Sequence, residues 1–236
     1  MDLMAALTAT WPAAETRRFR SWTLRRGAGG GNRVSAATLE GPWAAGGLAA
    51  AEAEMRAWGQ RPLVMVRPGE AELDAALAAR GYEVRDRSLL LAAPAAGLAA
   101  RPAETVIDGD GLLASVATIW AAGGIGPARL AVMARVAGPK TWLMARLDER
   151  VAGCAFVAAQ DGVAMLHALE VAPEARRRGL GAVLTRGAAA WAADRGVPTL
   201  GLAVTEANTP ARALYAGLGM AEAARYHYRL APAEED

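Results

Sequence analysis

The chain has 236 residues, of which 53% are hydrophobic, 21% charged and 6% aromatic. This length allows one large domain or two small ones, each with its own core. Because 26 basic residues face 24 acidic ones, the formal net charge is only +2, and the overall charge offers no argument for a nucleic-acid or membrane partner; we expect neither.

Cys154 is the single cysteine, so no disulfide can form within the chain and we expect a reducing, cytoplasmic compartment. With only two histidines beside it, we expect no metal site. The start carries Asp2 and no basic segment, which does not resemble a secretory signal. The uncharged stretch 111–128 contains glycines and Pro127, which favours a buried helix and a turn over a membrane span. We therefore expect a soluble protein.

In the first ninety residues the pattern predicts a strand at Leu63–Val66, a helix at Glu70–Arg80 that ends at Gly81, and a strand at Tyr82–Ala92. The same succession of short helix, glycine, large apolar residue and strand recurs around 211–220. The likeness indicates either an internal duplication or a chance match.

A linker is predicted at Pro94–Pro102, where small residues lie between two prolines without periodicity. It divides the chain into domains at 1–95 and 102–236. After it, the pattern predicts strand 104–107, helices 112–122 and 128–137, strands 141–147, 151–160 and 163–171, helix 179–195, strand 199–205, helix 210–218 and strand 223–230. The three central strands form an antiparallel meander because polar turns join them. We expect an α/β (α+β) fold with a mixed central sheet flanked by helices.

One segment carries a chemical signal, the turn between the strand that ends at Val171 and the helix that follows. It contains Arg176–Arg178, Gly179 and Gly181. Glycines allow a ligand to approach the backbone, and the free N–H groups of a helix start attract an anion. The pattern predicts a phosphate or pyrophosphate site. It lacks the end of a Walker A loop, and a meander precedes it, which excludes a dinucleotide fingerprint.

Two blocks resemble the GNAT acyltransferase superfamily. Leu169-Glu170-Val171-Ala172-Pro173 followed by Arg176-x-x-Gly179-x-Gly181 is similar to its coenzyme A signature. Asn208-x-x-Ala211-x-x-Leu214-Tyr215-x-x-x-Gly219-Met220 is similar to its second block. The resemblance covers roughly 102–230 and implies the GNAT acyl-CoA N-acyltransferase fold, with two GNAT-like halves if the repeat is real.

The resemblance implies acetyl-CoA as cofactor, with its pyrophosphate on the N–H groups of residues 176–181. Its pantetheine arm would pair with the strand at 169–171, in a cleft opened by a bulge and by splaying of the two central strands. A backbone N–H near Leu169 or Glu170 would face the thioester carbonyl. The implied cofactor-binding residues are Leu169, Glu170, Val171, Arg176, Arg177, Arg178, Gly179, Leu180, Gly181, Ala182, Asn208 and Tyr215.

The implied reaction is direct attack of a primary amine on the thioester, with Tyr215 as general acid; alternatively Tyr215 is a core aromatic. Glu170 and His167 are the candidate bases. A regular strand places them on opposite faces, and a bulge would change this. Asn208 either contacts the cofactor or caps the next helix. His227 has no comparable support, and Cys154 is expected in the core.

The first half lacks the arginine–glycine motif and has no tyrosine where the second has Tyr215. It resembles the degenerate N-terminal half of some bacterial tandem GNAT proteins. It either completes the packing or walls the acceptor pocket, with Trp22, Arg25 or Arg33 contacting substrate.

Alternative functions are a non-catalytic acyl-CoA-binding regulatory module and a protein N-terminal or lysine acetyltransferase. The acceptor is a small amine or a peptide that the sequence does not identify, and the protein is a monomer or a homodimer.

Overall fold

The computed structural model describes residues 2–44, 47–100, 106–109 and 114–233. Its helices are α1 (Leu3–Ala9), α2 (Asn32–Ser35), α3 (Leu48–Ala57), α4 (Ala71–Ala79), α5 (Ala95–Leu98), α6 (Ala114–Ala122), α7 (Pro127–Ala134), α8 (Leu180–Ala193) and α9 (Thr209–Gly217). Its strands are β1 (Glu15–Phe19), β2 (Trp22–Arg26), β3 (Thr38–Leu39), β4 (Leu63–Val66), β5 (Glu83–Pro94), β6 (Val106–Gly109), β7 (Lys140–Leu147), β8 (Arg150–Gln160), β9 (Val163–Val171), β10 (Thr199–Thr205) and β11 (Ala221–Leu230).

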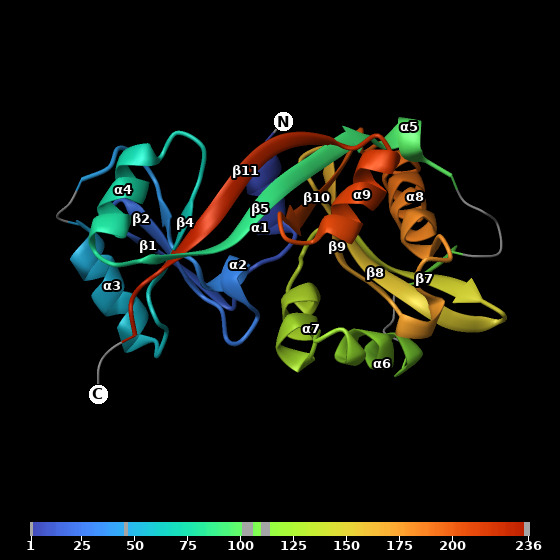
Figure 1. The fold of residues 1–236 in the computed structure, drawn as a ribbon, viewed down its shortest axis with the longest axis horizontal. Coiled ribbons are helices and arrows are strands. Elements are labelled where there is room, and N and C mark those ends of the chain that lie inside the picture. Colours follow the sequence, from blue (N-terminus) through green and yellow to red (C-terminus); the bar gives the residue numbers. More distant parts are fainter. Residues whose placement is uncertain (1, 45–46, 101–105, 110–113, 234–236) are drawn as a thin grey trace.

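The strands form a mixed sheet flanked by helices, as expected (Figure 1). An eight-stranded sheet has the order β4-β11-β5-β10-β9-β8-β7-β6, and a second sheet has the order β1-β2-β3. The predicted meander is present as β7, β8 and β9, which pair antiparallel in succession. Parts of the predicted strand 104–107 and helix 112–122 lie outside the described residues, and β6 and α6 are the parts described.

The two halves of the chain exchange strands at the centre of the large sheet. β11, from the end of the chain, lies between β4 and β5, and β5 lies between β11 and β10. Figure 1 shows β5 and β11 as two long strands that run side by side across the molecule. The division at 95–102 therefore stays a prediction, while the structure shows that each part contributes a strand to the other.

On each side of the β5–β11 pair there is one further strand and then a three-stranded meander. β10 pairs parallel with β9, the last strand of the β7–β9 meander. On the other side, β4 meets the end of the β1–β3 meander through a parallel bridge between Ala37 and Val64. Part of the segment that the sequence predicts as a linker is helical: Ala95–Leu98 forms α5, and Ala95 N donates to Pro198 O at 2.8 Å.

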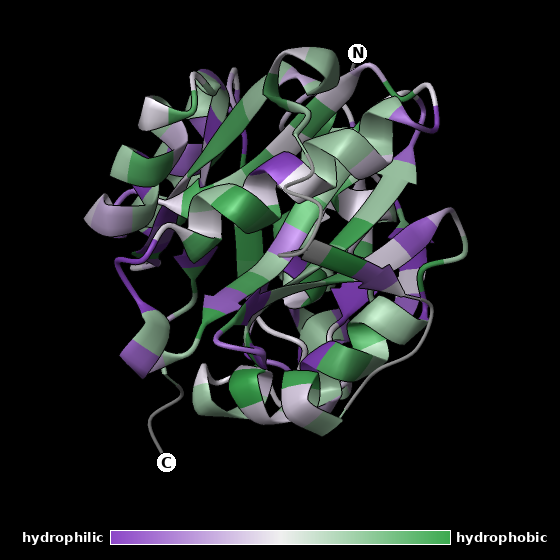
Figure 2. Cartoon of the chain, turned by 90° about the vertical axis from the view of Figure 1, so that its right-hand side faces the viewer, coloured by the Kyte–Doolittle hydropathy of each residue, from purple (hydrophilic) through white to green (hydrophobic). Residues whose placement is uncertain are grey.

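The apolar interior consists of three clusters of buried side chains. One packs α8 on the sheet around Trp191, and a second joins α1, α3 and α4 to β4, β9 and β11. The third lies under α6 and α7 around Trp120 and Phe156. Figure 2 shows long hydrophobic stretches along the strands of the central sheet. Among the described residues, no helix is long and apolar enough to cross a membrane.

Candidate active site

The site begins where β9 and β10 separate. Their parallel pairing runs from Thr199–Val163 to Leu202–Leu166 and then stops, although both strands continue. Backbone groups of the later part of β9 therefore have no neighbour on the β10 side and are left for a ligand. This is the splaying that the resemblance implied.

A bulge in β9 lies directly beyond this point. On β8, Cys154 faces Glu170 and Phe156 faces His167, so β9 carries one extra residue between the two pairs. Ala168 has a φ of +50°, and its carbonyl accepts a hydrogen bond of 2.7 Å from Trp120 Nε1. Because the extra residue reverses the alternation, His167 and Glu170 line one cavity rather than opposite faces.

This central cavity has a volume of about 320 Å³. Its lining residues are Arg33, Ile125, Arg129, Leu166, His167, Ala168, Leu169, Glu170, Leu202, Ala203, Val204, Thr205, Asn208, Ala211, Leu214 and Tyr215.

The turn before α8 borders a larger cavity of about 690 Å³. Gly179 and Arg177 have φ values of +84° and +63°. Within the described chain, the amide N–H groups of residues 177–182 donate to no other residue. Free N–H groups and the positive end of the helix dipole together favour an anion here. The lining residues are Leu169, Glu170, Val171, Ala175, Arg176, Arg177, Gly179, Leu180, Gly181, Ala182, Asn208, Pro210, Ala211 and Leu214.

The three arginines of this turn do not act alike. Arg176 and Arg177 line the large cavity, and Arg176 Nε donates to Val171 O at 3.1 Å. Arg178 does not line it, and its Nη1 lies 3.4 Å from Asp148 Oδ2 at the β7–β8 turn. At Gly181 a Cβ would lie 2.8 Å from Leu214 Cδ2, so glycine allows α8 and α9 to approach.

Tyr215 projects from α9 into the central cavity, and only 7% of its surface is exposed to solvent. Burial, helped by the charge of Glu170, raises the pKa of its hydroxyl to about 12, so the phenol keeps its proton at neutral pH. Asn208 caps α9, since its Oδ1 accepts from Ala211 N at 3.2 Å. It also lines both cavities, so its two predicted roles are compatible.

Glu170 is half-buried beside the turn between α6 and α7. Burial raises the pKa of its carboxyl, while the charges of Arg176 and Arg129 oppose the shift. The side chain lies against Gly123, where a Cβ would be 2.5 Å from Glu170 Cδ. Glycine at position 123 therefore makes room for this carboxylate.

His167 is buried, with hydrogen bonds at both ring nitrogens. Nε2 lies 2.9 Å from Thr10 Oγ1, which donates its own proton to Ala6 O at 2.6 Å. The hydroxyl must therefore accept from Nε2–H. Nδ1 accepts from Arg33 Nη1 at 3.3 Å. Burial and the charge of Arg33 lower the pKa of His167 well below its usual value, so the imidazole is neutral.

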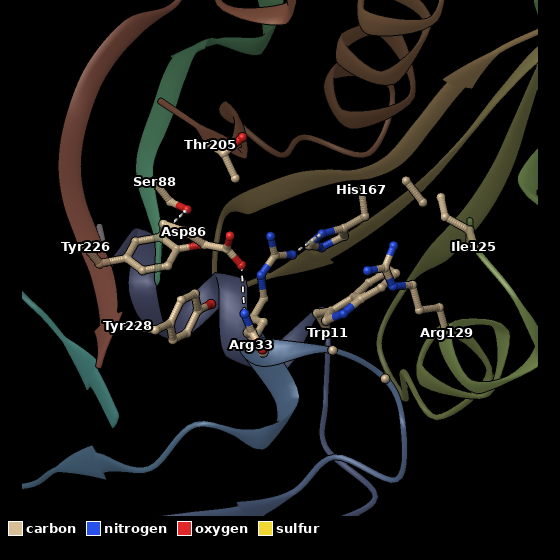
Figure 3. A pocket seen from close by; sticks show the side chains of 14 residues that line it. Trp11, Arg33, Asp86, Ser88, Ile125, Arg129, His167, Thr205, Tyr226 and Tyr228 are labelled. Atoms are coloured by element: carbon tan, nitrogen blue, oxygen red, sulfur yellow. Dashed lines mark hydrogen bonds between the residues drawn. The ribbon is translucent and has the colours of Figure 1, made fainter. Parts of the chain in front are cut away.

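A third cavity, of about 240 Å³, adjoins the central one (Figure 3). Both halves of the chain line it: Trp11, Gly30, Gly31, Asn32, Arg33, Asp86 and Ser88 from the first, and Ile125, Arg129, His167, Ala168, Thr205, Tyr226 and Tyr228 from the second. Of the three first-half candidates, Arg33 is at this site. Trp22 is in the core, and Arg25 donates to Ala36 O and Thr38 Oγ1.

Two remaining candidates lie apart from these cavities. His227 Nε2 is 2.8 Å from Asp74 Oδ1, on the part of the sheet where β11 pairs with β4. Cys154 is in the apolar core, and burial, with the charge of Glu170, raises the pKa of its thiol to about 12. In the described part of the chain, no three His, Cys, Asp or Glu side chains gather as metal ligands.

Sequence reasoning missed five residues that line the third cavity, namely Trp11, Asp86, Arg129, Tyr226 and Tyr228. It also missed Thr10, which contacts His167. They belong to no motif, and the contact between Thr10 and His167 joins positions 157 residues apart. Their only sequence signal is residue type, which does not distinguish a cavity wall from a core.

Comparisons with known proteins agree on the fold. Residues 124–220 match the family model described as the acetyltransferase (GNAT) family. A search of curated proteins finds no match to this sequence.

Several solved structures share the architecture over nearly the whole chain. One is titled a GCN5-related N-acetyltransferase from Kribbella flavida; it is 21% identical, covers 98% of this chain and 95% of its own, and has a TM-score of 0.70. A protein of unknown function from Staphylococcus epidermidis is 9% identical, covers 94% of each chain and has a TM-score of 0.71. A tandem GNAT protein from the clavulanic acid biosynthesis pathway is 17% identical, covers 95% of this chain and 86% of its own, and has a TM-score of 0.64.

Proposed function

We propose that the protein is an N-acetyltransferase, because residues 124–220 match the acetyltransferase (GNAT) family model and the chain has the fold of GNAT structures. It would transfer an acetyl group from acetyl-CoA to a primary amine. The observation that carries the proposal is the β9 bulge. It brings Glu170 and Tyr215 into one cavity, between an anion-binding helix start and a third, polar cavity.

The chain fits acetyl-CoA in three respects. The unpaired N–H groups of residues 177–182 suit a pyrophosphate. Arg176 and Arg177 add positive charge at the same cavity. The separated edge of β9 leaves backbone at 169–171 free for an amide-bearing arm.

When bound, acetyl-CoA supplies a thioester at which the amine nitrogen forms a C–N bond and the C–S bond breaks. Glu170 accepts the proton that the attacking amine loses, because its carboxylate lines the cavity and its raised pKa makes it a better base. Tyr215 donates a proton to the departing sulfur. Glu170 then releases its proton to solvent, and Tyr215 takes one back. The high pKa of Tyr215 keeps that proton available across the neutral range.

His167 is better suited to positioning than to proton removal. Its Nδ1 accepts a hydrogen bond from Arg33, and its Nε2–H donates one to the hydroxyl of Thr10. We therefore assign the base role to Glu170 and give His167 the role of holding Arg33.

The acceptor cavity supports a small molecule over a protein substrate. It measures about 240 Å³ and is walled by residues from both halves of the chain. A peptide or lysine acetyltransferase needs an open groove. The first half would thus contribute the acceptor wall, and we infer from the matching strand order that it is a second GNAT-like half without its own cofactor turn.

The test is thiol release from acetyl-CoA with a panel of small primary amines, with mass spectrometry of the N-acetylated product. Tyr215→Phe should lower kcat by about 10²-fold with little change in KM for acetyl-CoA, because general acid catalysis is worth that much and the ring remains in place. Tyr82→Phe is the matched control, since Tyr82 is bonded to Glu52 in the first-half core.

Two outcomes would contradict the proposal. Tight coenzyme A binding without turnover of any amine would indicate a non-catalytic acyl-CoA-binding module. Turnover only with peptides would indicate a protein acetyltransferase. An unchanged kcat in Tyr215→Phe would leave the activity in place but remove the acid role.

A further inference from the structure

The third cavity contains a cation, Arg33, that forms no ion pair with the described residues. Arg33, on α2, donates from Nη1 to the neutral His167, and its Nε is buried with no hydrogen-bond partner. Among the described residues, no carboxylate forms an ion pair with its guanidinium. A charge held away from water is costly unless an opposite charge compensates it.

Arg33 stays charged in this cavity, because a guanidinium does not lose its proton in proteins. Burial by itself lowers the pKa of its guanidinium, but the neighbouring Tyr226 and Tyr228 outweigh burial and raise it. Figure 3 shows the Arg33 side chain reaching to His167 in the middle of the pocket, with the two tyrosines and Asp86 on one side. Trp11 and Arg129 lie on the other side.

Arg129 brings a second cation to the same space. It is an exposed residue in the first turn of α7 and lines both the central and the third cavity, as Arg33 does. Its guanidinium lies close to Gly31: a Cβ added at position 31 would be 3.6 Å from Arg129 Nη2. Two guanidinium groups at one cavity match a carboxylate, whose two oxygens accept paired N–H bonds.

Two carboxylates lie near these cations, and among the described residues neither forms an ion pair with them. Glu170 is at the junction with the cofactor cavity. Asp86 is in the third cavity, and its Oδ2 accepts from Asn32 Nδ2 at 2.7 Å. Arg33 and Arg129 thus place positive charge at the third cavity, while Glu170 lies where the central cavity meets the cofactor cavity.

We propose that the acceptor is a small primary amine that also carries a carboxylate, held by Arg33 and Arg129 with its amine directed to Glu170. This inference rests on the proposed acetyltransferase function and adds its substrate class. Free amino acids are the simplest members of that class.

The experiment compares acids with their carboxamides in thiol-release assays. The panel is the L-α-amino acids, β-alanine and γ-aminobutyrate, each with its amide. On the pH plateau above the acidic limb, where the influence of Arg129 on the pKa of Glu170 does not affect the rate, Arg129→Gln should lower kcat/KM for the preferred acid by at least about tenfold. The value for its amide and the KM for acetyl-CoA should change by less than about twofold, because only a charged hydrogen bond to the carboxylate is lost. Arg129 suits the test because it is exposed, so the variant should fold.

Arg186→Gln is the matched control. Arg186 is exposed on α8 outside all three cavities, and the substitution removes the same charge. It should leave acids and amides unchanged. Equal loss for acid and amide in Arg129→Gln, or no preference for acids in the wild type, would overturn the proposal while leaving the acetyltransferase function intact.

A binding measurement separates the two proposals if no amine is turned over. With coenzyme A present, the N-acetylated amino acids should raise Tm of the wild type, their amides should not, and Arg129→Gln should abolish the shift. That result would support the carboxylate site even if the transferase proposal failed. No shift with any N-acetylated acid would overturn it.

Discussion

At the residue scale, the chemistry of the site depends on which side-chain groups are already held in hydrogen bonds. His167 has the residue type that is most often a base near neutral pH, yet both its nitrogens are bonded, and burial lowers its pKa. Glu170 has the opposite balance: it forms no ion pair or hydrogen bond among the described residues, and burial raises its pKa. Side-chain type alone would have ranked these residues the other way.

The pH dependence of turnover should report Glu170. A base acts when deprotonated, so the acidic limb of kcat/KM should lie above the usual glutamate pKa of about 4.3, because burial raises the pKa of Glu170. Glu170→Gln should remove this limb and lower kcat by about 10²-fold. Tyr215 should contribute no basic limb in the neutral range, since its pKa is about 12. The measurement is a pH–rate profile at saturating acetyl-CoA.

A pair of glycine variants controls for a general effect of substitution. Gly123→Ala should disturb Glu170, because the new Cβ would lie 2.5 Å from Cδ, and should reduce kcat in the same direction. In Gly126→Ala, in the same turn, the new Cβ would meet no atom within 4 Å, and kcat should not change.

An acidic limb of the pH–rate profile that survives in Glu170→Gln would assign the base to water or to another group.

At the scale of elements, the start of α8 shows how one turn leaves the backbone N–H groups of a helix start without partners among the described residues. Gly179 has a left-handed backbone, and the N–H groups around it have no partner in the described chain. Arg178 was expected at the phosphate, but its side chain extends to Asp148, so the backbone contributes more to the cradle than the arginine run suggests.

Gly179→Ala should raise the Kd for coenzyme A by about tenfold, because a left-handed alanine costs about 1–2 kcal/mol and the turn would relax away from it. Gly196→Ala is the matched control: Gly196 follows the same helix, has a φ of +67° and meets nothing within 4 Å. Both variants should lose similar stability, measured by denaturant unfolding, but only Gly179→Ala should weaken binding, measured by calorimetry. Equal weakening in both would show that the effect is one of stability.

At the scale of the whole molecule, the two halves are joined by more than a linker. β5 and β11 cross into each other's part of the sheet, and α1 packs with β9 residues Val163 and Met165 in one apolar cluster. The third cavity lies at this junction, which explains why Arg33 and His167 meet although they are 134 positions apart.

This interlocking predicts a single unfolding transition. Leu77→Ala, at a fully buried position in α4, should cost about 2–5 kcal/mol and lower Tm for the entire chain. Calorimetry and hydrogen exchange of α8 amides should report the same shift as amides of α4. Two separate transitions, or a change confined to the first half, would show that the halves unfold independently.

The sequence by itself determined the parts that depend on local pattern. The meander, α8 with its glycine turn, and α9 with Asn208 and Tyr215 follow from alternation, helical periodicity and short motifs, which neighbouring residues encode. The first half was less predictable: α1, β1, β2 and α3 carry no strong signal, because much of their order comes from packing against the rest of the chain.

Only the tertiary structure decided how the site is assembled. The bulge at Ala168 turns Glu170 and His167 to the same cavity, and a non-glycine residue with a φ of +50° is not signalled by local sequence, because the surrounding sheet and Trp120 stabilise it. The strand exchange between the halves brings four residues to the wall of one cavity: Arg33, Asp86, Arg129 and Tyr226. Local propensity cannot encode such contacts, since their free energy arises only when distant segments pack together.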